Sequence, residues 1–116
     1  MSDIFLIDEE IPLELQEGDA GDIEITVPDE FSMTDRTVKF GVFNDDGSQV
    51  FMKTTEDDPD PITIAGQVIT IPGLAVKTEG KAGRYHWEIE TGKTGEQPVT
   101  IGQGILTIRK TWIKNA

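Results

Sequence analysis

The chain has no cysteine among its 116 residues, and it has one histidine and one tyrosine. The absence of cysteine excludes thiol nucleophiles, CxxC redox pairs and thiolate zinc sites, and it leaves the redox compartment undetermined. Only His86 is available for imidazole chemistry. The length suits one ordinary hydrophobic core that needs no disulfide or metal. We therefore expect residues 1–116 to form a single domain without a cofactor.

Basic residues are also scarce, with 10 Lys and Arg against 22 Asp and Glu, for a net charge of −12. The acids are concentrated in residues 1–60, while residues 61–116 hold a small excess of bases. Such a surface repels phosphate backbones, so nucleic acid and anionic membranes are poor partners. The asymmetry has two interpretations. In the first, the acidic part is a solvated face that keeps the protein soluble. In the second, the acidic region of one molecule contacts the basic region of a neighbouring copy or partner.

Long hydrophobic runs are missing. The first ten residues, MSDIFLIDEE, contain four apolar residues flanked by acids. A secretory signal has a basic flank and a longer apolar core, and a spanning helix needs about 20 apolar residues. We expect neither a signal peptide nor a membrane span.

No window shows an apolar period of 3.6 residues, whereas alternation with a period of two is frequent. The pattern predicts roughly eight short strands separated by turns, which is typical of an all-β fold. We predict an immunoglobulin-like sandwich of two antiparallel sheets. The residues expected to face its core are Ile23, Ile25, Val27, Val38, Phe40, Val42, Val50, Met52, Tyr85, Trp87, Ile89, Val99, Ile101, Ile105 or Leu106, and Ile108.

Turn residues separate these runs. Asn44 to Gly47 and Ala65-Gly66 are expected to reverse two hairpins, because glycine and asparagine tolerate positive φ. Pro12 cannot donate a ladder hydrogen bond, so the strand beside it should lie at a sheet edge. The acidic, proline-broken residues 54–61 are expected to form an exposed connection. Gly102-Gln103-Gly104 predicts a bulge or kink in the last strand.

The only tyrosine, the only histidine and one of two tryptophans lie together at residues 85–87. In a strand, Tyr85 and Trp87 face one side and His86 faces the other. Two such rings can fill the centre of a small sandwich. The tyrosine hydroxyl then needs a partner, which in immunoglobulin-like domains is the backbone at a nearby corner. Gly83, just before it, would let the chain enter the strand tightly.

Conventional catalytic motifs are not apparent. His86 has no Ser or Asp arrangement around it, and its outward position beside Glu88 is interpreted as a solvated cross-strand pair. The acidic groups at residues 44–47 and 56–60 do not follow the spacing of a calcium loop and are interpreted as a turn and a solvated loop. Gly92-Lys93-Thr94 lacks the earlier glycine of a phosphate loop and is interpreted as a hairpin turn. We predict no catalytic residue, no metal ligand and no enzyme.

Three aromatic residues lie outside the predicted inward register: Phe43, Phe51 and Trp112. If Phe43 and Phe51 pair across the hairpin at residues 46–47, they form an apolar patch on an otherwise polar face. Such patches often mark contact with another chain. The alternative is that a loop or the amino-terminal strand covers them. We select these three residues as candidate partner contacts.

The order of motifs resembles a known family. TDRTVKFGV at residues 34–42 is followed by a DG turn, a GQVITI hairpin, GRYHWEIE and TIGQGILTI. This succession is similar to the immunoglobulin-like β-sandwich modules of tailed bacteriophages and prophages, in particular the amino-terminal domain of phage baseplate upper proteins, over about residues 20–110. None of that family's binding residues matches a position here, so none is transferred.

The resemblance implies a non-enzymatic virion structural protein of a tail, baseplate or fibre attachment. Its partners would be other phage structural proteins or copies of itself, as a possible homo-oligomer, in the virion or in the bacterial cytoplasm during assembly. Docking is expected to use preformed sheet edges and the acidic surface. The alternative is a carbohydrate- or calcium-binding module of a bacterial surface or secreted protein.

Overall fold

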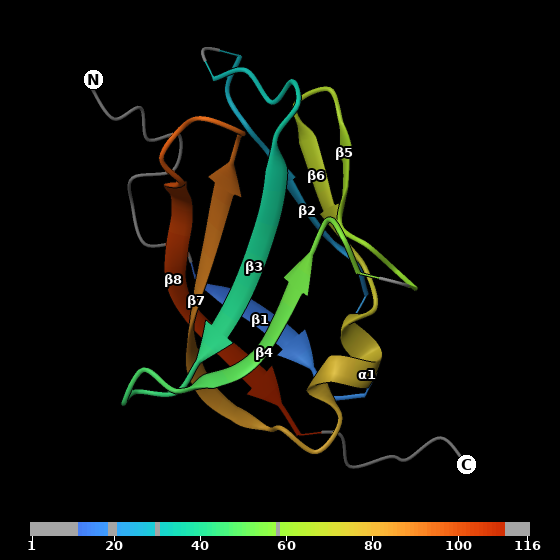
Figure 1. The fold of residues 1–116 in the computed structure, drawn as a ribbon. Coiled ribbons are helices and arrows are strands. Elements are labelled where there is room, and N and C mark those ends of the chain that lie inside the picture. Colours follow the sequence, from blue (N-terminus) through green and yellow to red (C-terminus); the bar gives the residue numbers. More distant parts are fainter. Residues whose placement is uncertain (1–11, 19–20, 30, 58, 111–116) are drawn as a thin grey trace.

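A computed structural model describes residues 12–18, 21–29, 31–57 and 59–110, which form two packed β-sheets and one short helix (Figure 1). In chain order the elements are β1 (Leu13–Gln16), β2 (Ile23–Thr26), β3 (Thr37–Phe43), β4 (Gln49–Thr54), β5 (Thr63–Ala65), β6 (Val68–Ile71), α1 (Leu74–Thr78), β7 (Gly83–Gly92) and β8 (Val99–Arg109).

The strands are arranged in the order β1-β8-β7-β3-β4 in one sheet and β2-β6-β5 in the other. In immunoglobulin constant-type domains, strands G, F and C are neighbours in one sheet and B, E and D in the other. The strands β8-β7-β3 and β2-β6-β5 reproduce these two orders. The predicted immunoglobulin-like, all-β sandwich of about eight strands is confirmed.

One pairing differs from the prediction of wholly antiparallel sheets. β1 lies parallel to β8, with Leu13 opposite Leu106 and Leu15 opposite Ile108. A parallel pair needs a long connection, and here the whole intervening chain provides it. β1 is an edge strand, as Pro12 predicted.

The core lies between the sheets and is formed by inward residues of both. Phe40 is central, with its ring centroid 5.9 Å from that of Trp87 and 6.5 Å from that of Phe51. Ile23, Ile25, Val99 and Tyr85 are partly buried and pack against it. The fully or nearly fully buried apolar residues are Val27, Phe31, Met33, Val38, Phe40, Val42, Phe51, Ile62, Ile69, Ile71, Leu74, Trp87, Ile89, Ile101, Leu106 and Ile108.

β8 contains the predicted bulge. Ile89 pairs with Gly102 and the next residue, Glu90, pairs with Thr100, so Ile101 is the extra residue. Because of this extra residue, the inward side chains of β8 have odd numbers before the bulge and even numbers after it. The sequence left Ile105 or Leu106 as the inward residue, and the buried one is Leu106, which is 0% exposed.

β4 contains a second bulge, which the sequence did not reveal. Phe43 pairs with Gln49, but Val42 pairs with Phe51, so Val50 is the extra residue. Paired residues of an antiparallel ladder lie on the same face. Phe51 therefore faces inward with Val42 and is 6% exposed.

This bulge corrects two predictions. Val50 and Met52 were the expected inward residues of β4, but Phe51 and Lys53 are the buried ones. Val50, the extra residue of the bulge, is partly buried and still packs against the core. Continuing the register of the turn without a bulge would have placed Phe51 opposite Gly41, on the outer face. Phe51 belongs to the core and does not form the predicted surface pair with Phe43.

The corner between α1 and β7 has the predicted tyrosine interaction. The Tyr85 hydroxyl donates a hydrogen bond of 2.7 Å to the carbonyl oxygen of Lys81. Gly83 has φ 154°, and a Cβ there would lie 3.2 Å from the tyrosine oxygen, so glycine gives the ring room to reach the corner. Trp87, two residues after the tyrosine, occupies the position at which antibody domains carry their second cysteine.

The turns follow the sequence with one shift. The β3–β4 hairpin closes through the amide of Asn44, which donates to the carbonyl oxygen of Ser48, and β7 ends at Gly92, the first residue of the predicted reversal. In the β5–β6 hairpin, Ala65 is still paired with Val68. The turn is therefore Gly66-Gln67 and not Ala65-Gly66, with the positive φ at its first residue.

Candidate functional site

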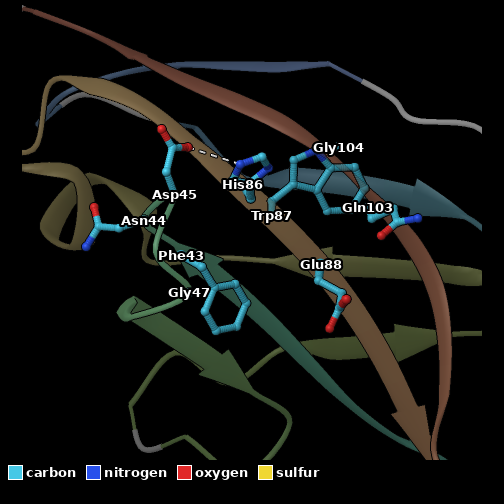
Figure 2. A pocket seen from close by; sticks show the side chains of 9 residues that line it. All are labelled: Phe43, Asn44, Asp45, Gly47, His86, Trp87, Glu88, Gln103 and Gly104. Atoms are coloured by element: carbon cyan, nitrogen blue, oxygen red, sulfur yellow. Dashed lines mark hydrogen bonds and ion pairs between the residues drawn. The ribbon is translucent and has the colours of Figure 1, made fainter.

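A hollow of about 320 Å³ lies where the β3–β4 hairpin meets β7 and β8, and we call it the hairpin hollow (Figure 2). It opens on the outer face of the five-stranded sheet. Its lining combines aromatic, acidic, amide and imidazole side chains with two glycines. The lining residues are Phe43, Asn44, Asp45, Gly47, His86, Trp87, Glu88, Gln103 and Gly104.

Strand register brings the central side chains together. Phe43 is opposite His86, and Gly41 is opposite Glu88, with all four on the outer face of β3 and β7. Because Gly41 has no side chain, the Phe43 ring lies across its backbone, so close that a Cβ at Gly41 would be 2.7 Å from the ring. Met52 borders the same space. Figure 2 shows Phe43 and Glu88 extending in the same direction.

His86 forms a solvated pair with the hairpin between β3 and β4, and Glu88, on the same strand as His86, takes no part in it. Its Nε2 lies 3.1 Å from Oδ1 of Asp45, and the two side chains are 50% and 92% exposed (Figure 2). Glu88 is two positions along the same strand, whereas the hairpin folds Asp45 back toward the imidazole. The acidic turn is a structural hairpin turn, as predicted.

The turn that carries Asp45 is held by its neighbour. Asp46 Oδ1 accepts hydrogen bonds from the Ser48 hydroxyl, at 2.7 Å, and from the Ser48 amide, at 2.8 Å. These two bonds hold the pKa of the Asp46 carboxyl below its usual range. The ionised Asp46 therefore stabilises the hairpin that positions Asp45.

The three candidate contacts have different outcomes. Phe43 lines the hairpin hollow, Phe51 is buried in the core, and Trp112 lies outside the described residues. Sequence reasoning missed Glu88 and Gln103 as site residues. Alternation placed Glu88 on the outer face, but only the strand register shows that Gln103, Glu88 and Gly41 lie side by side across β8, β7 and β3.

A buried cation lies at the other end of β4. Lys53 is 3% exposed, and its Nζ donates to the Asp60 carbonyl oxygen at 2.7 Å and lies 3.5 Å from Oδ2 of Asp57. Asp57 also accepts hydrogen bonds from the amide and hydroxyl of Thr54. Burial raises the pKa of Asp57, but these bonds and the Lys53 ammonium together lower it below its usual range. The predicted exposed connection at residues 54–61 is thus anchored to the strand.

The edges of the sheets carry features that hinder pairing with another strand. β4 has an inward-pointing lysine and a bulge, β5 has only three residues, and Pro12 precedes β1. Proteins use such features to protect edge strands. These features do not extend to β2, the fourth edge strand, so docking through preformed sheet edges stays a prediction.

Two further properties concern only the described part of the chain. In those residues, no three His, Cys, Asp or Glu side chains gather closely enough to hold a metal ion. Nor does any helix within them have the length and apolar character needed to cross a membrane.

No protein-family model and no curated protein sequence matches the chain. Among solved structures, a chain with extracellular domains 3–5 of Drosophila OTK is similar over 93% of this chain, with 13% identity and a TM-score of 0.40. The match covers 36% of that structure, so the present chain spans about a third of its length.

Proposed function

We propose that the chain is a non-enzymatic assembly module of a bacteriophage or prophage particle, in its tail, baseplate or fibre attachment. It docks onto other structural proteins of the particle through the outer face of the five-stranded sheet. The phage assignment rests on the resemblance of the motif order at residues 34–108. The docking surface is supported by one observation: Phe43 and Met52 lie together and half-buried on that outer face.

The composition of this face suits contact with a protein. Its apolar centre is surrounded by charges of both signs, such as Lys39, which lies opposite Glu90, and Arg84 near the other end of β7. An apolar centre with a polar rim is the usual anatomy of a protein interface. The long paired strands of this sheet supply a preformed support, so docking would order little of the backbone.

Particle incorporation tests the proposal. Particles induced from the host strain are purified, and the chain is quantified in them by mass spectrometry. We expect the parent to be present and Met52→Glu to be depleted about tenfold or more, because a charge at the apolar centre opposes docking. The control is Val76→Glu, since Val76 is 81% exposed on α1, away from the face.

Both variants are first compared with the parent by thermal unfolding, so that loss of folding is not mistaken for loss of docking. Absence of the parent chain from purified particles would refute the proposal. Normal incorporation of Met52→Glu would refute the docking face.

Carbohydrate binding is the second candidate, and the hairpin hollow favours it. An aromatic ring beside amide and carboxylate groups, as with Phe43, Gln103 and Glu88, can contact both the apolar and the hydroxyl surfaces of a sugar. A glycan array with the parent and Phe43→Ala tests this candidate. Sugar-specific binding that is lost in the variant, together with a ligand-dependent rise in Tm, would support it.

A further inference from the structure

We propose that the hairpin hollow is a receptor for the guanidinium group of an arginine side chain from the assembly partner. The inference rests on the proposed function, because it names the chemistry by which the partner is recognised. It uses four observations: the shape of the hollow, the position of the aromatic ring, the acceptors around it and the charge of the chain.

The hollow has the form needed for one inserted side chain. Gly47 and Gly104 contribute to its wall without side chains of their own. Gly104 lies opposite Trp87, whose indole is buried on the inner side of the sheet, so the outer surface here is backbone. The hollow is bounded on one side by the hairpin and on the other by Gln103. An extended side chain can enter between them.

The Phe43 ring provides a surface for a flat cation. It is held against the sheet because it fills the space that Gly41 leaves empty, with Met52 on its border. Guanidinium groups stack on aromatic faces, where the ring quadrupole attracts the positive charge. A ring that is already fixed loses little conformational entropy on binding.

Hydrogen-bond acceptors also line the hollow. Glu88 is half-buried opposite Gly41, and its carboxylate has no hydrogen bond or ion pair with the described residues. Asp45 uses Oδ1 for His86, while its Oδ2 accepts no hydrogen bond from the described residues. The Gln103 amide oxygen is a third acceptor on the opposite side. A planar guanidinium has five donors and can reach several acceptors at once, which a lysine ammonium does less well.

Electrostatics favours a cation over a neutral ligand. Two carboxylates line the hollow, and the whole chain has a net charge of −12. A strongly acidic protein attracts basic partners and increases their rate of encounter. A sugar would gain nothing from this field, so arginine fits the hollow better than the second candidate ligand.

The test is a two-dimensional ¹H–¹⁵N NMR titration of the full chain with N-acetyl-arginine-amide. We expect saturable shifts confined to the backbone amides of residues 43–47, 86–88 and 103–104. N-acetyl-lysine-amide, which has the same charge, should bind about fivefold more weakly because it cannot stack and bridge in the same way. The neutral isostere N-acetyl-citrulline-amide should bind about tenfold more weakly or not at all.

Two variants and one matched control assign the site. Glu88→Gln should weaken arginine binding about tenfold, and Phe43→Leu about fivefold. The control is Glu90→Gln, which makes the same charge change on the same strand and face but outside the hollow, and should change affinity less than about twofold. Dispersion of the amide spectrum verifies that each variant is folded.

Several results would overturn the proposal. These are no shift at the hollow, equal shifts with arginine and lysine spread over the acidic surface, or equal weakening by Glu88→Gln and Glu90→Gln. Binding of a neutral sugar at these residues in place of arginine would also overturn it and would support the second candidate. A chain that enters particles without binding arginine would refute this inference alone, because incorporation is measured separately.

Discussion

At the scale of single residues, the Trp87 ring explains why the neighbouring strand carries glycine at position 102. Gly104 lies opposite Trp87, and a Cβ at Gly102 would lie 3.1 Å from the indole and 3.2 Å from Ile89. A side chain at position 102 would compete with the indole for the same space. Gly102 is therefore a packing feature of the core.

This packing predicts that Gly102→Ala lowers the free energy of unfolding by about 1–3 kcal/mol, the usual cost of overfilling a core. The measurement is chemical denaturation. Gly21→Ala is the control, since its Cβ would have no atom within 4 Å. Replacing the indole with a smaller ring, by Trp87→Phe, should reduce the loss of unfolding free energy that Gly102→Ala causes. An equal loss in the parent and in the Trp87→Phe variant would show that the indole does not obstruct a side chain at position 102.

The tyrosine corner makes a separate prediction. Tyr85→Phe removes the 2.7 Å hydrogen bond to the Lys81 carbonyl but retains the ring. We expect a loss of about 1 kcal/mol in the free energy of unfolding, the typical net value of one hydrogen bond. Equilibrium denaturation in urea measures it. A variant as stable as the parent would show that water replaces the hydroxyl at no cost.

Asp57 predicts a dependence of stability on acid. Its pKa is below the usual range in the folded chain, so it binds a proton more readily after unfolding. Its stabilising contribution is therefore present above the unfolded pKa, near 4, and is lost as the pH falls through the lower folded value. Unfolding measured between about pH 6 and pH 2 should show that the stability difference between parent and Asp57→Asn narrows with acid.

The control for this comparison is Glu56→Gln, because the Glu56 carboxylate has no hydrogen bond or ion pair with the described residues. Its difference from the parent should change little over the same range. A constant difference between the parent and Asp57→Asn would contradict the assigned role of Asp57.

At the scale of elements, the bulge in β4 determines which residues are buried. Deleting Val50 would remove the extra residue and leave Phe51 opposite Val42, with Lys53 still inward. Deleting Met52 would force either Phe51 or Lys53 to the outer face. We therefore expect the Met52 deletion to reduce the free energy of unfolding by about 3 kcal/mol more than the Val50 deletion.

Guanidinium denaturation of the two deletion variants measures this difference directly. Each lacks one residue of the same strand, so changes in chain length cancel. Equal losses would mean that the strand can shift its register freely, against the structure.

The elements also show how far the sequence could predict the fold. Alternation identified the inward faces of β3 and β7, because strand period alone determines them. It failed for β4, since an extra residue inside a run leaves no compositional signal when Val50, Phe51 and Met52 are all apolar. In β8 the glycines at 102 and 104 marked the bulge.

The hairpin hollow was predictable only in part. Phe43 was selected as a candidate contact because it lies outside the predicted inward register, and it lines the hollow. Glu88, Asp45 and Gln103 come from three separate segments, and their proximity depends on pairings between β3, β7 and β8 that no single run of sequence specifies. The parallel pairing of β1 with β8 could not be predicted either, because apolar and polar residues alternate in the same way in parallel and antiparallel strands.

At the scale of the whole molecule, the net charge of −12 predicts a response to salt. Repulsion among so many acids opposes the compact state, and ions screen it. Raising the ionic strength from about 0.01 M to about 0.15 M shortens the Debye length from roughly 30 Å to 8 Å. We expect the Tm, measured by differential scanning fluorimetry, to rise by a few degrees over this range. A decrease would show that attractive ion pairs outweigh the repulsion.

The parallel pairing of β1 with β8 affects how the protein is made. β1 is synthesised early, but its partner residues, from Leu106 to Arg109, leave the ribosome more than ninety residues later. Until then the nascent chain has no ladder for β1, and β7 has an exposed edge. Contacts between such distant segments make folding slow, and unfinished sheets aggregate readily. Completion of this sheet therefore waits for β8, and chaperones would protect the chain until that strand is available.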